Sequence, residues 1–284
     1  MTLALTAENG VHSFDIALDP QSALDLREAI FRGINLAPGA AIPSDGDPRI
    51  DRAAPGFMFT CGPDHIRHPE PVEGATDGRR YPLHGSLSSH PAKDILFEED
   101  ESEVVCSARV PVTLANGETA ELQRRWRADR QSGQITLEDI VTNTGARPWP
   151  PVAMYHVNLN TRLFDETTRL TGAMLEGGSL PWRFGDGDMR IFCVSAAETA
   201  ENGWADIAIG PIASLGGRSL HLRFRVDTLP YLQVWRNQSP GCHVMGLEPV
   251  SQRLAGRSEL IASGEMADFK PGETVDYGLS FELR

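Results

Sequence analysis

Glu248 is the ionisable residue whose surroundings point most clearly to acid–base chemistry. It stands in the apolar run CHVMGLEPV (242–250). A carboxylate in such surroundings is poorly solvated, which raises its pKa and makes it a better proton acceptor near neutral pH. The alternative is a glutamate at a strand end that points into water, and the residues alone leave both interpretations open.

Two histidines stand in segments that otherwise have the pattern of a strand or a turn. In VAMYHVNLN (152–160), His156 shares its period-two face with Asn158. Two polar side chains on one strand face suit a binding surface, and a core histidine bonded to a backbone carbonyl is the alternative. His84, in YPLHGSLSSHPA (81–92), lies beside a glycine in a loop and is the weaker candidate.

Other kinds of catalytic site receive less support. Glu248, His84 and His156 could form a metal site of two histidines and one carboxylate. No His-x-His or His-x-x-x-His spacing joins them, so no metal is expected. His65 and His68 look like a ligand pair, although a solvated loop is the simpler interpretation. The sequence also lacks a Gly-x-Ser-x-Gly elbow and a glycine-rich phosphate loop.

Charge and composition narrow the range of partners. The 284 residues carry a net charge of −13, so nucleic acid, which needs a basic face, is not an expected partner. An anionic membrane surface is disfavoured for the same reason. A neutral sugar stays compatible, because net charge governs solubility and steering rather than one site. The four cysteines are widely spaced and match neither a zinc site nor a small disulfide scaffold.

Hydropathy favours a cytoplasmic protein with no membrane partner. Residues 1–11 contain neither the basic region nor the long apolar run of a signal peptide. No stretch approaches the roughly 20 apolar residues that a membrane-spanning helix needs.

The elements that must position these residues are mostly β-strands. In 274–283 the apolar residues occupy every second position, which places them on one face of a strand. The segments 219–227 and 104–112 alternate in the same way. Further strands are expected at 121–128, 134–142, 152–159, 190–195, 204–209, 231–236 and 242–247.

Helical signals are weak by comparison. The stretch 21–31 could form a short helix capped by Ser22 or, equally, a strand. Short strands between Gly- and Pro-containing turns predict an all-β fold, a sandwich or a barrel, and of the two we expect a large antiparallel β-sandwich. At this length we expect a single domain over residues 1–284. The Pro-, Gly- and Asp-rich stretches 37–56 and 69–82 are expected to be functional or mobile loops.

Taken in order, these segments resemble the galactose mutarotase-like superfamily, which includes the aldose 1-epimerases (mutarotases). ITLEDIVTNTGARPWPPVAMYHVNLN (135–160) is similar to the central signature of that family, and LHG (83–85) to its first histidine motif. PYLQVWRN (230–237) resembles its Pro-x-x-Gln-x-aromatic strand, and GLEP (246–249) its catalytic glutamate segment. The resemblance covers about residues 30–284 and implies the supersandwich fold of that superfamily.

A less characterised epimerase-like branch of the superfamily is the closer match. GFMFTCGPDHI (56–66), followed by LHGSLSSHPA, MYHVNLN and LEPV, resembles that branch. Well-studied mutarotases carry a Gly-Arg-x-x-Asn-Arg segment where this chain has FMFTCG, and an arginine there helps to bind the sugar. Arg32, in FRGIN, is the candidate replacement. No residue can be assigned to the substrate-binding aspartate of the family.

The resemblance implies a ring-opening reaction on a small-molecule sugar, with no cofactor. Glu248 would remove the proton of the anomeric hydroxyl, and His156 would protonate the ring oxygen. The reference pKa values, about 4.3 for Glu and about 6.5 for His, fit those roles. His84 would hydrogen-bond the ring oxygen or a neighbouring hydroxyl. Sugar-binding candidates are Arg32, Asn158, Gln233 and Trp235, the last of which could stack on the sugar.

The same fold is compatible with other functions. A catalytically silent sugar-binding protein and a sugar epimerase or isomerase acting at another carbon both stay open. A glycoside hydrolase normally needs two facing carboxylates, and only Glu248 stands in a matching segment. A phosphorylated sugar is a further option, because Arg79, Arg80 and Arg236 lie near the motif segments. A homodimer through an edge strand is one arrangement open to such a protein.

Overall fold

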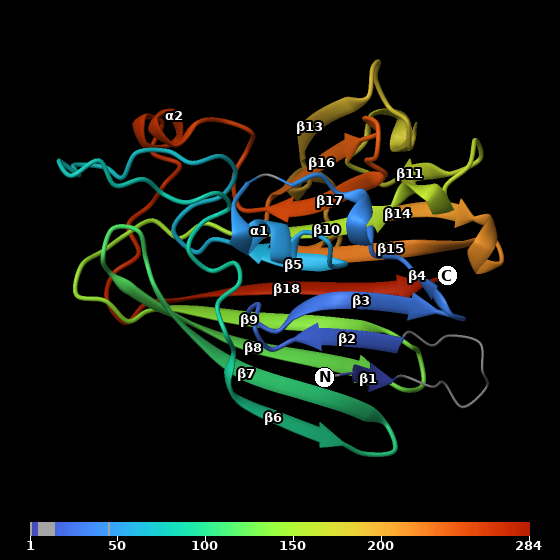
Figure 1. Ribbon diagram of the computed structural model, residues 1–284, viewed down its shortest axis with the longest axis horizontal. Helices are drawn as coiled ribbons and strands as arrows, with labels where there is room; N and C mark the ends of the chain where they lie inside the picture. Colours follow the sequence, from blue (N-terminus) through green and yellow to red (C-terminus); the bar gives the residue numbers. More distant parts are fainter. Residues whose placement is uncertain (1, 5–14, 45) are drawn as a thin grey trace.

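Two antiparallel β-sheets make up most of the molecule (Figure 1). The computed structural model describes residues 2–4, 15–44 and 46–284. The expectation of no signal peptide in residues 1–11 therefore concerns a segment that mostly lies outside the described residues. Each sheet has nine strands, and side chains of both sheets form one large hydrophobic core. The predicted all-β antiparallel sandwich is confirmed.

The first sheet carries the candidate residues. In spatial order its strands are β1 (Thr2–Ala4), β2 (Asp15–Asp19), β3 (Asp25–Phe31), β5 (Met58–Cys61), β10 (Met154–Asn160), β17 (Val244–Val250), β16 (Tyr231–Asn237) and β13 (Met189–Ser195), and β4 (Ile34–Asn35) pairs with β3. β10 and β17 are neighbours in the middle of this sheet, and both are buried along nearly their whole length.

The second sheet forms the opposite layer. In spatial order its strands are β12 (Ser179–Pro181), β11 (Arg169–Thr171), β14 (Trp204–Ile212), β15 (Arg218–Arg225), β18 (Thr274–Leu283), β9 (Ile135–Asn143), β8 (Thr119–Asp129), β7 (Glu103–Thr113) and β6 (Lys93–Glu99). The helices are α1 (Pro48–Ala53), α2 (Arg257–Ala262) and short 3-10 turns at Gly39–Ala41, Thr161–Leu163, Glu176–Gly178, Ala197–Thr199 and Ala213–Leu215.

Period-two alternation decides which side chains of a strand enter the core. In β15, Leu220, Leu222 and Phe224 are fully buried, and the residues between them are only half-buried. Every strand predicted from the sequence is present, with ends that differ by a few residues. Burial of one face specifies the strand register, because a shift by one residue would expose the whole apolar set.

The ambiguous stretch 21–31 forms strand β3, so its interpretation as a helix is wrong. Ser22 does not cap a helix, and its hydroxyl donates instead to Asp25 Oδ2 at 3.1 Å. Ala23 and Leu24 have φ angles of 49° and 58°, which form a tight turn rather than a helical start. Pairing with β2 and burial of Phe31 then favour an extended chain.

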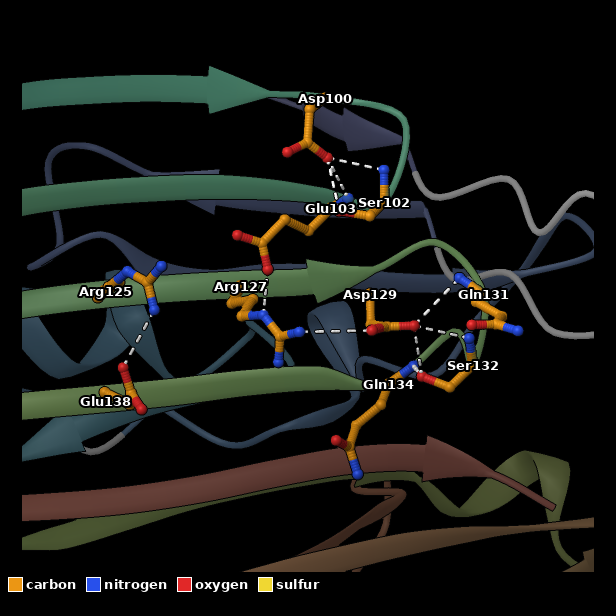
Figure 2. Close-up of polar contacts among 10 residues, drawn as sticks. All are labelled: Asp100, Ser102, Glu103, Arg125, Arg127, Asp129, Gln131, Ser132, Gln134 and Glu138. Carbon is orange, nitrogen blue, oxygen red and sulfur yellow. Dashed lines mark hydrogen bonds and ion pairs between the residues drawn. The ribbon is translucent and has the colours of Figure 1, made fainter.

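Ion pairs, some exposed and some half-buried, lie on the outer face of the second sheet (Figure 2). Arg125 lies 3.3 Å from Glu138 across β8 and β9, and Arg127 lies between Glu103 and Asp129. An exposed pair such as Arg125 and Glu138 contributes little to stability, typically about 0–1 kcal/mol.

The outer face of the first sheet is not open to solvent as that of the second sheet is, because other segments of the protein pack on it. Helix α1 and the loop between β5 and β6 pack on it and form a second, smaller apolar cluster with β5 and β10. Figure 1 shows α2 beside the same loop, where Arg257 donates to the Asp64 carbonyl at 2.7 Å and to the Tyr81 hydroxyl at 3.1 Å. Among the residues that the structure describes, no helix is long and apolar enough to cross a membrane.

Candidate active site

A cavity opens on the covered face of the first sheet. Tyr155 and Val157 of β10 belong to the core between the sheets, so His156, which lies between them in sequence, points to the opposite face. The cavity has a volume of about 670 Å³, a size typical of small-molecule sites. Its floor includes His156 of β10, Glu248 of β17 and the pair Gln233 and Trp235 of β16.

Among the described residues that line this cavity, Glu248 is the one carboxylate, and it is fully buried. Leu247 and Val250, beside it on β17, are also fully buried. Burial raises the pKa of Glu248, and the nearby His156 and the hydrogen bond from Gln233 oppose that rise. The expected poor solvation of this carboxylate is therefore present, and the alternative of a water-exposed glutamate is wrong.

His156 lies directly beside Glu248. Its Nε2 is 3.2 Å from Glu248 Oε1, yet that oxygen and His156 Nδ1 both lack a hydrogen-bond partner. The imidazole stacks on Phe59 with ring centroids 4.8 Å apart and meets Trp235 edge-on at 5.8 Å. Two aromatic rings thus hold His156 in place without using its polar atoms.

His84 reaches the same cavity from the loop between β5 and β6. Its ring meets His156 edge-on with centroids 5.7 Å apart. Burial, followed by the nearby His156, lowers the pKa of His84 well below its ordinary value, so its ring is neutral near pH 7. Its buried Nδ1 has no partner. A neutral imidazole offers one donor and one acceptor to a bound molecule.

The loop that carries His84 is clamped in place by backbone contacts. The His84 amide donates to the Arg67 carbonyl at 2.8 Å, and its carbonyl accepts from the Gly62 amide at 2.9 Å. Arg49 of α1 donates to the Gly85 carbonyl at 2.9 Å. Gly85 has a φ of +83°, and a Cβ there would lie 2.1 Å from a backbone oxygen. Only glycine fits at that position.

A chain of side-chain hydrogen bonds runs from Glu248 through Gln233 to Arg67. Gln233 Nε2 donates to Glu248 Oε2, Arg67 Nε donates to Gln233 Oε1 at 3.0 Å, and Arg67 Nη2 donates to the Gln252 carbonyl at 3.1 Å. Arginine has no acceptor atom, so it fixes the Gln233 amide with its NH₂ group toward the carboxylate. This geometry places Gln233 as a support for Glu248.

Gly246 makes the close approach of Glu248 and His156 possible. It lies opposite Asn158 and Trp235 in the neighbouring strands. A Cβ at this position would lie 2.4 Å from Glu248 Oε1 and 3.0 Å from a ring carbon of His156. Any larger residue would therefore force the carboxylate and the imidazole apart.

Five of the seven residues singled out from the sequence line one cavity: His84, His156, Gln233, Trp235 and Glu248. Asn158 and Arg32 do not. Asn158 is buried and donates to the carbonyl of Ala54, the residue that follows α1, at 2.9 Å. Arg32 is exposed in the turn between β3 and β4, with its guanidinium 5.2 Å from the Phe31 ring centroid.

The arginines that suggested a phosphorylated sugar also lie outside the cavity lining. Arg236 is buried on the other face of β16 and donates to the carbonyls of Phe184, Gly185 and Asp188. Arg79 and Arg80 are exposed on the loop between β5 and β6. None of the three provides a phosphate subsite here.

Arg67 and Phe59 line the cavity and were not singled out from the sequence. Phe59 stands in the strand segment GFMFTCG, where its apolar side chain resembles any core residue. Arg67 belongs to the HIRH segment, which we expected to be a solvated loop; its residues are instead buried (His65), half-buried (Arg67) and exposed (His68). Within the described part of the chain, no group of three or more His, Cys, Asp or Glu side chains could hold a metal ion.

A known family of sequences includes this protein. The family model described as "Domain of unknown function (DUF4432)" matches residues 4–176 and 190–283. The chain belongs to this family. No curated protein matches the sequence.

Several solved structures are similar in fold to this chain of the DUF4432 family. A candidate aldose 1-epimerase from Klebsiella pneumoniae has a TM-score of 0.75 at 19% identity, over 96% of this chain and 78% of that one. A galactose mutarotase-like protein from Clostridium acetobutylicum has a TM-score of 0.67 at 13% identity, over 97% and 94%. Another, from Lactobacillus casei, has a TM-score of 0.65 at 14% identity and covers 100% of both chains.

The DUF4432 chain therefore has the galactose mutarotase-like fold, and the expected resemblance is confirmed at that level. Its cavity brings together a buried carboxylate of raised pKa, an imidazole within 3.2 Å of that carboxylate, and a second, neutral imidazole. Such a set can take a proton from one oxygen of a bound molecule and give a proton to another.

Proposed function

We propose that this protein is an aldose 1-epimerase-like enzyme, which interconverts the α and β anomers of a reducing sugar. The observation that carries the proposal is the buried pair of Glu248 and His156, with 3.2 Å between carboxylate and imidazole nitrogen, at the floor of a cavity. The fold, found in a galactose mutarotase-like protein of L. casei, supports the same reaction class.

In the proposed reaction the Glu248 carboxylate takes the proton of the anomeric hydroxyl, and protonated His156 gives a proton to the ring oxygen. The C1–O5 bond breaks as C1–O1 becomes a carbonyl, which produces the open-chain aldehyde. After C1 rotates, neutral His156 takes back the proton of the O5 hydroxyl, O5 attacks the other face of C1, and Glu248 returns its proton to O1. Both oxygens are bonded to C1, so an adjacent acid and base can serve both.

The other cavity residues would assist this exchange. His84, with its neutral ring, would donate to the ring oxygen or a neighbouring hydroxyl. Trp235 would stack on one face of the sugar, and Gln233 with Arg67 would hold the carboxylate. All of these groups belong to the chain, so the proposed reaction uses a sugar alone and no cofactor.

Anomeric exchange followed by NMR tests this proposal. The wild-type protein should accelerate α/β exchange of at least one reducing sugar, and Glu248→Gln and His156→Gln should each lower kcat by about 10²-fold or more. Glu138→Gln, which changes an exposed carboxylate on β9, is the matched control and should keep full activity.

Two results would contradict the assignment. Near-normal rates in both site variants would remove Glu248 and His156 from the chemistry. Sugar binding without anomeric exchange in the wild type would instead indicate a sugar-binding protein, or an isomerase that acts at another carbon.

A further inference from the structure

Three exposed apolar side chains form the mouth of the cavity. Met189, Ile191 and Leu254 are 56%, 46% and 45% exposed and line the cavity; we call them the apolar rim. Exposed apolar side chains are ordinary when they are scattered, but a group of them at a binding site indicates a surface that an apolar ligand covers.

The apolar rim is continuous with the candidate catalytic groups. In the pairing of β13 with β16, Ile191 lies opposite Trp235 and Met189 lies opposite Asn237. Trp235 in turn contacts the His156 ring. A sugar held at Glu248 and His156 would therefore extend toward the rim, and the rim belongs to the same cavity.

The opposite wall of the cavity is also apolar. It is formed by Ile42, Pro43, Ile50 and Ala54, from the segment that contains α1, and by Leu83 beside His84. None of these side chains can hydrogen-bond a sugar hydroxyl.

Several polar groups of the lining already have partners within the protein. Gln233 and Arg67 are joined to one another, to Glu248 and to Gln252. Asn237 Oδ1 accepts from the Ser239 amide at 2.9 Å. Arg190 runs along Gly185 and donates to the Met189 carbonyl at 3.0 Å. These side chains are thus partly occupied before any sugar binds.

We infer that the sugar accepted at this site is a deoxy sugar, in which the part facing the apolar rim lacks a hydroxyl. This inference rests on the proposed function. A hydroxyl that leaves water without finding a partner costs free energy, whereas a methyl group in its place gains from burial. The rim and the apolar wall therefore favour the deoxygenated member of a pair of related sugars.

Matched sugar pairs test the inference directly. D-fucose with D-galactose, D-quinovose with D-glucose, L-rhamnose with L-mannose, and 2-deoxy-D-ribose with D-ribose each differ by one hydroxyl. Exchange NMR should give a kcat/KM about 10- to 100-fold higher for the deoxy member of at least one pair. Equal or better turnover of the parent sugar in every pair overturns the inference while leaving the mutarotase proposal intact.

Variants of the rim separate its contribution from a general preference of the reaction. Ile191→Ser and Leu254→Ser should each lower the deoxy-to-parent ratio by about 3- to 10-fold through loss of apolar contact. Leu96→Ser, on the edge strand β6 and 63% exposed, is the control and should leave the ratio unchanged. A ratio that stays constant in both rim variants overturns the role of the rim.

The preference for a deoxy sugar can also be tested by binding if the protein does not catalyse the proposed reaction. If no sugar in the panel is exchanged, the mutarotase proposal fails, and binding to the same pairs is measured by ligand-observed NMR. Tighter binding of a deoxy sugar than of its parent, weakened by Ile191→Ser, still supports the inference. Equal binding of both members of all pairs overturns it.

Discussion

Strand β10 separates two buried polar clusters that differ in how completely their atoms are used. Tyr155 points into the core and donates to Asp139 Oδ2 at 2.7 Å, and the next residue, His156, points into the cavity. The core cluster centres on Arg124, which is 1% exposed. We call it the Arg124 cluster; its other members are Asp25, Thr60, Asp139 and Tyr155.

The Arg124 cluster is saturated with hydrogen bonds. All five N–H groups of Arg124 are used, on the Ala23 carbonyl, Asp25, Thr60 and both oxygens of Asp139. The two carboxylates more than offset burial and raise the pKa of Arg124. The cluster joins the two sheets, because Arg124 and Asp139 come from the second and Asp25 and Thr60 from the first.

The cavity cluster of His84, His156 and Glu248 is incomplete by contrast. Each of the three side chains has one buried polar atom without a partner. A buried polar atom without a partner costs stability, so a protein that retains three of them at one site gives up stability there. The comparison separates a cluster that joins the sheets with all its donors paired from one in which three buried polar atoms are unpaired.

The largest expected effect concerns the saturated cluster. Arg124→Met would leave two buried carboxylates without their cation, so we expect unfolding free energy to fall by about 3–5 kcal/mol. Urea denaturation measures this loss. Arg125→Met, which changes the neighbouring residue and removes only the exposed pair shown in Figure 2, should change stability by less than about 1 kcal/mol. Similar losses in both variants would contradict the distinction between buried and exposed arginines.

In the incomplete cavity cluster, removal of a charge should increase the unfolding free energy instead of lowering it. The pKa of Glu248 is raised in the folded protein above its ordinary 4.5, so the folded state binds this proton more tightly than the unfolded state. The stability contributed by the group is present below pH 4.5 and lost as pH rises through the raised pKa. Glu248→Gln removes that loss and should stabilise the protein at pH 8 by on the order of 1 kcal/mol.

Urea denaturation of wild type and Glu248→Gln at pH 8, 6.5 and 5 measures this effect. The stabilisation should shrink toward pH 5, because the wild-type carboxyl then becomes protonated. Asp139→Asn, a matched removal of charge in the Arg124 cluster, should destabilise instead. A Glu248→Gln protein that is less stable than wild type at pH 8 would mean that the cavity carboxylate is a structural group.

The sequence predicts most of the fold because the strands are marked by alternation. In β15 and β18 one face is apolar, and that face enters the core. The stretch 21–31 could not be decided in this way, because its closely spaced apolar residues fit a helix or a strand. Its conformation depends on pairing with β2, which is a tertiary contact.

The site was partly predictable for a related reason. Glu248 and His156 stand out as polar residues within apolar strands, and both line the cavity. Alternation also placed Asn158 on the face of His156, but it does not reveal how far the cavity extends along that face. Asn158 is used instead in a hydrogen bond to the carbonyl of Ala54. Arg67 was missed because it reaches Gln233 across 166 residues of sequence, a contact that no local pattern encodes.

Substitution of Arg67 should have the smallest effect of these predictions, and it tests the comparison of the two clusters most specifically. In the wild type, its guanidinium orients the Gln233 amide so that the NH₂ group faces Glu248, and its charge lowers the pKa of that carboxyl against the effect of burial. In Arg67→Met the amide is free to turn its oxygen toward Glu248, so the pKa of the carboxyl should rise further.

The activity of Arg67→Met should therefore be lost most at acidic pH. The base must be ionised to act, so at pH 6 we expect kcat/KM of Arg67→Met to be about 3- to 10-fold below that of the wild type, the effect of one hydrogen bond. The difference between the two proteins should become smaller toward pH 9. Arg67→Lys keeps a positive donor that accepts no hydrogen bond and should restore most of the wild-type pH profile. An equal loss at every pH would mean that Arg67 supports the cavity only by packing. A loss confined to acidic pH would mean that Arg67, through Gln233, sets the pKa of the Glu248 carboxyl in the incomplete cluster. In the Arg124 cluster every N–H group of the arginine is already used, so it has no free donor with which to adjust a neighbouring group.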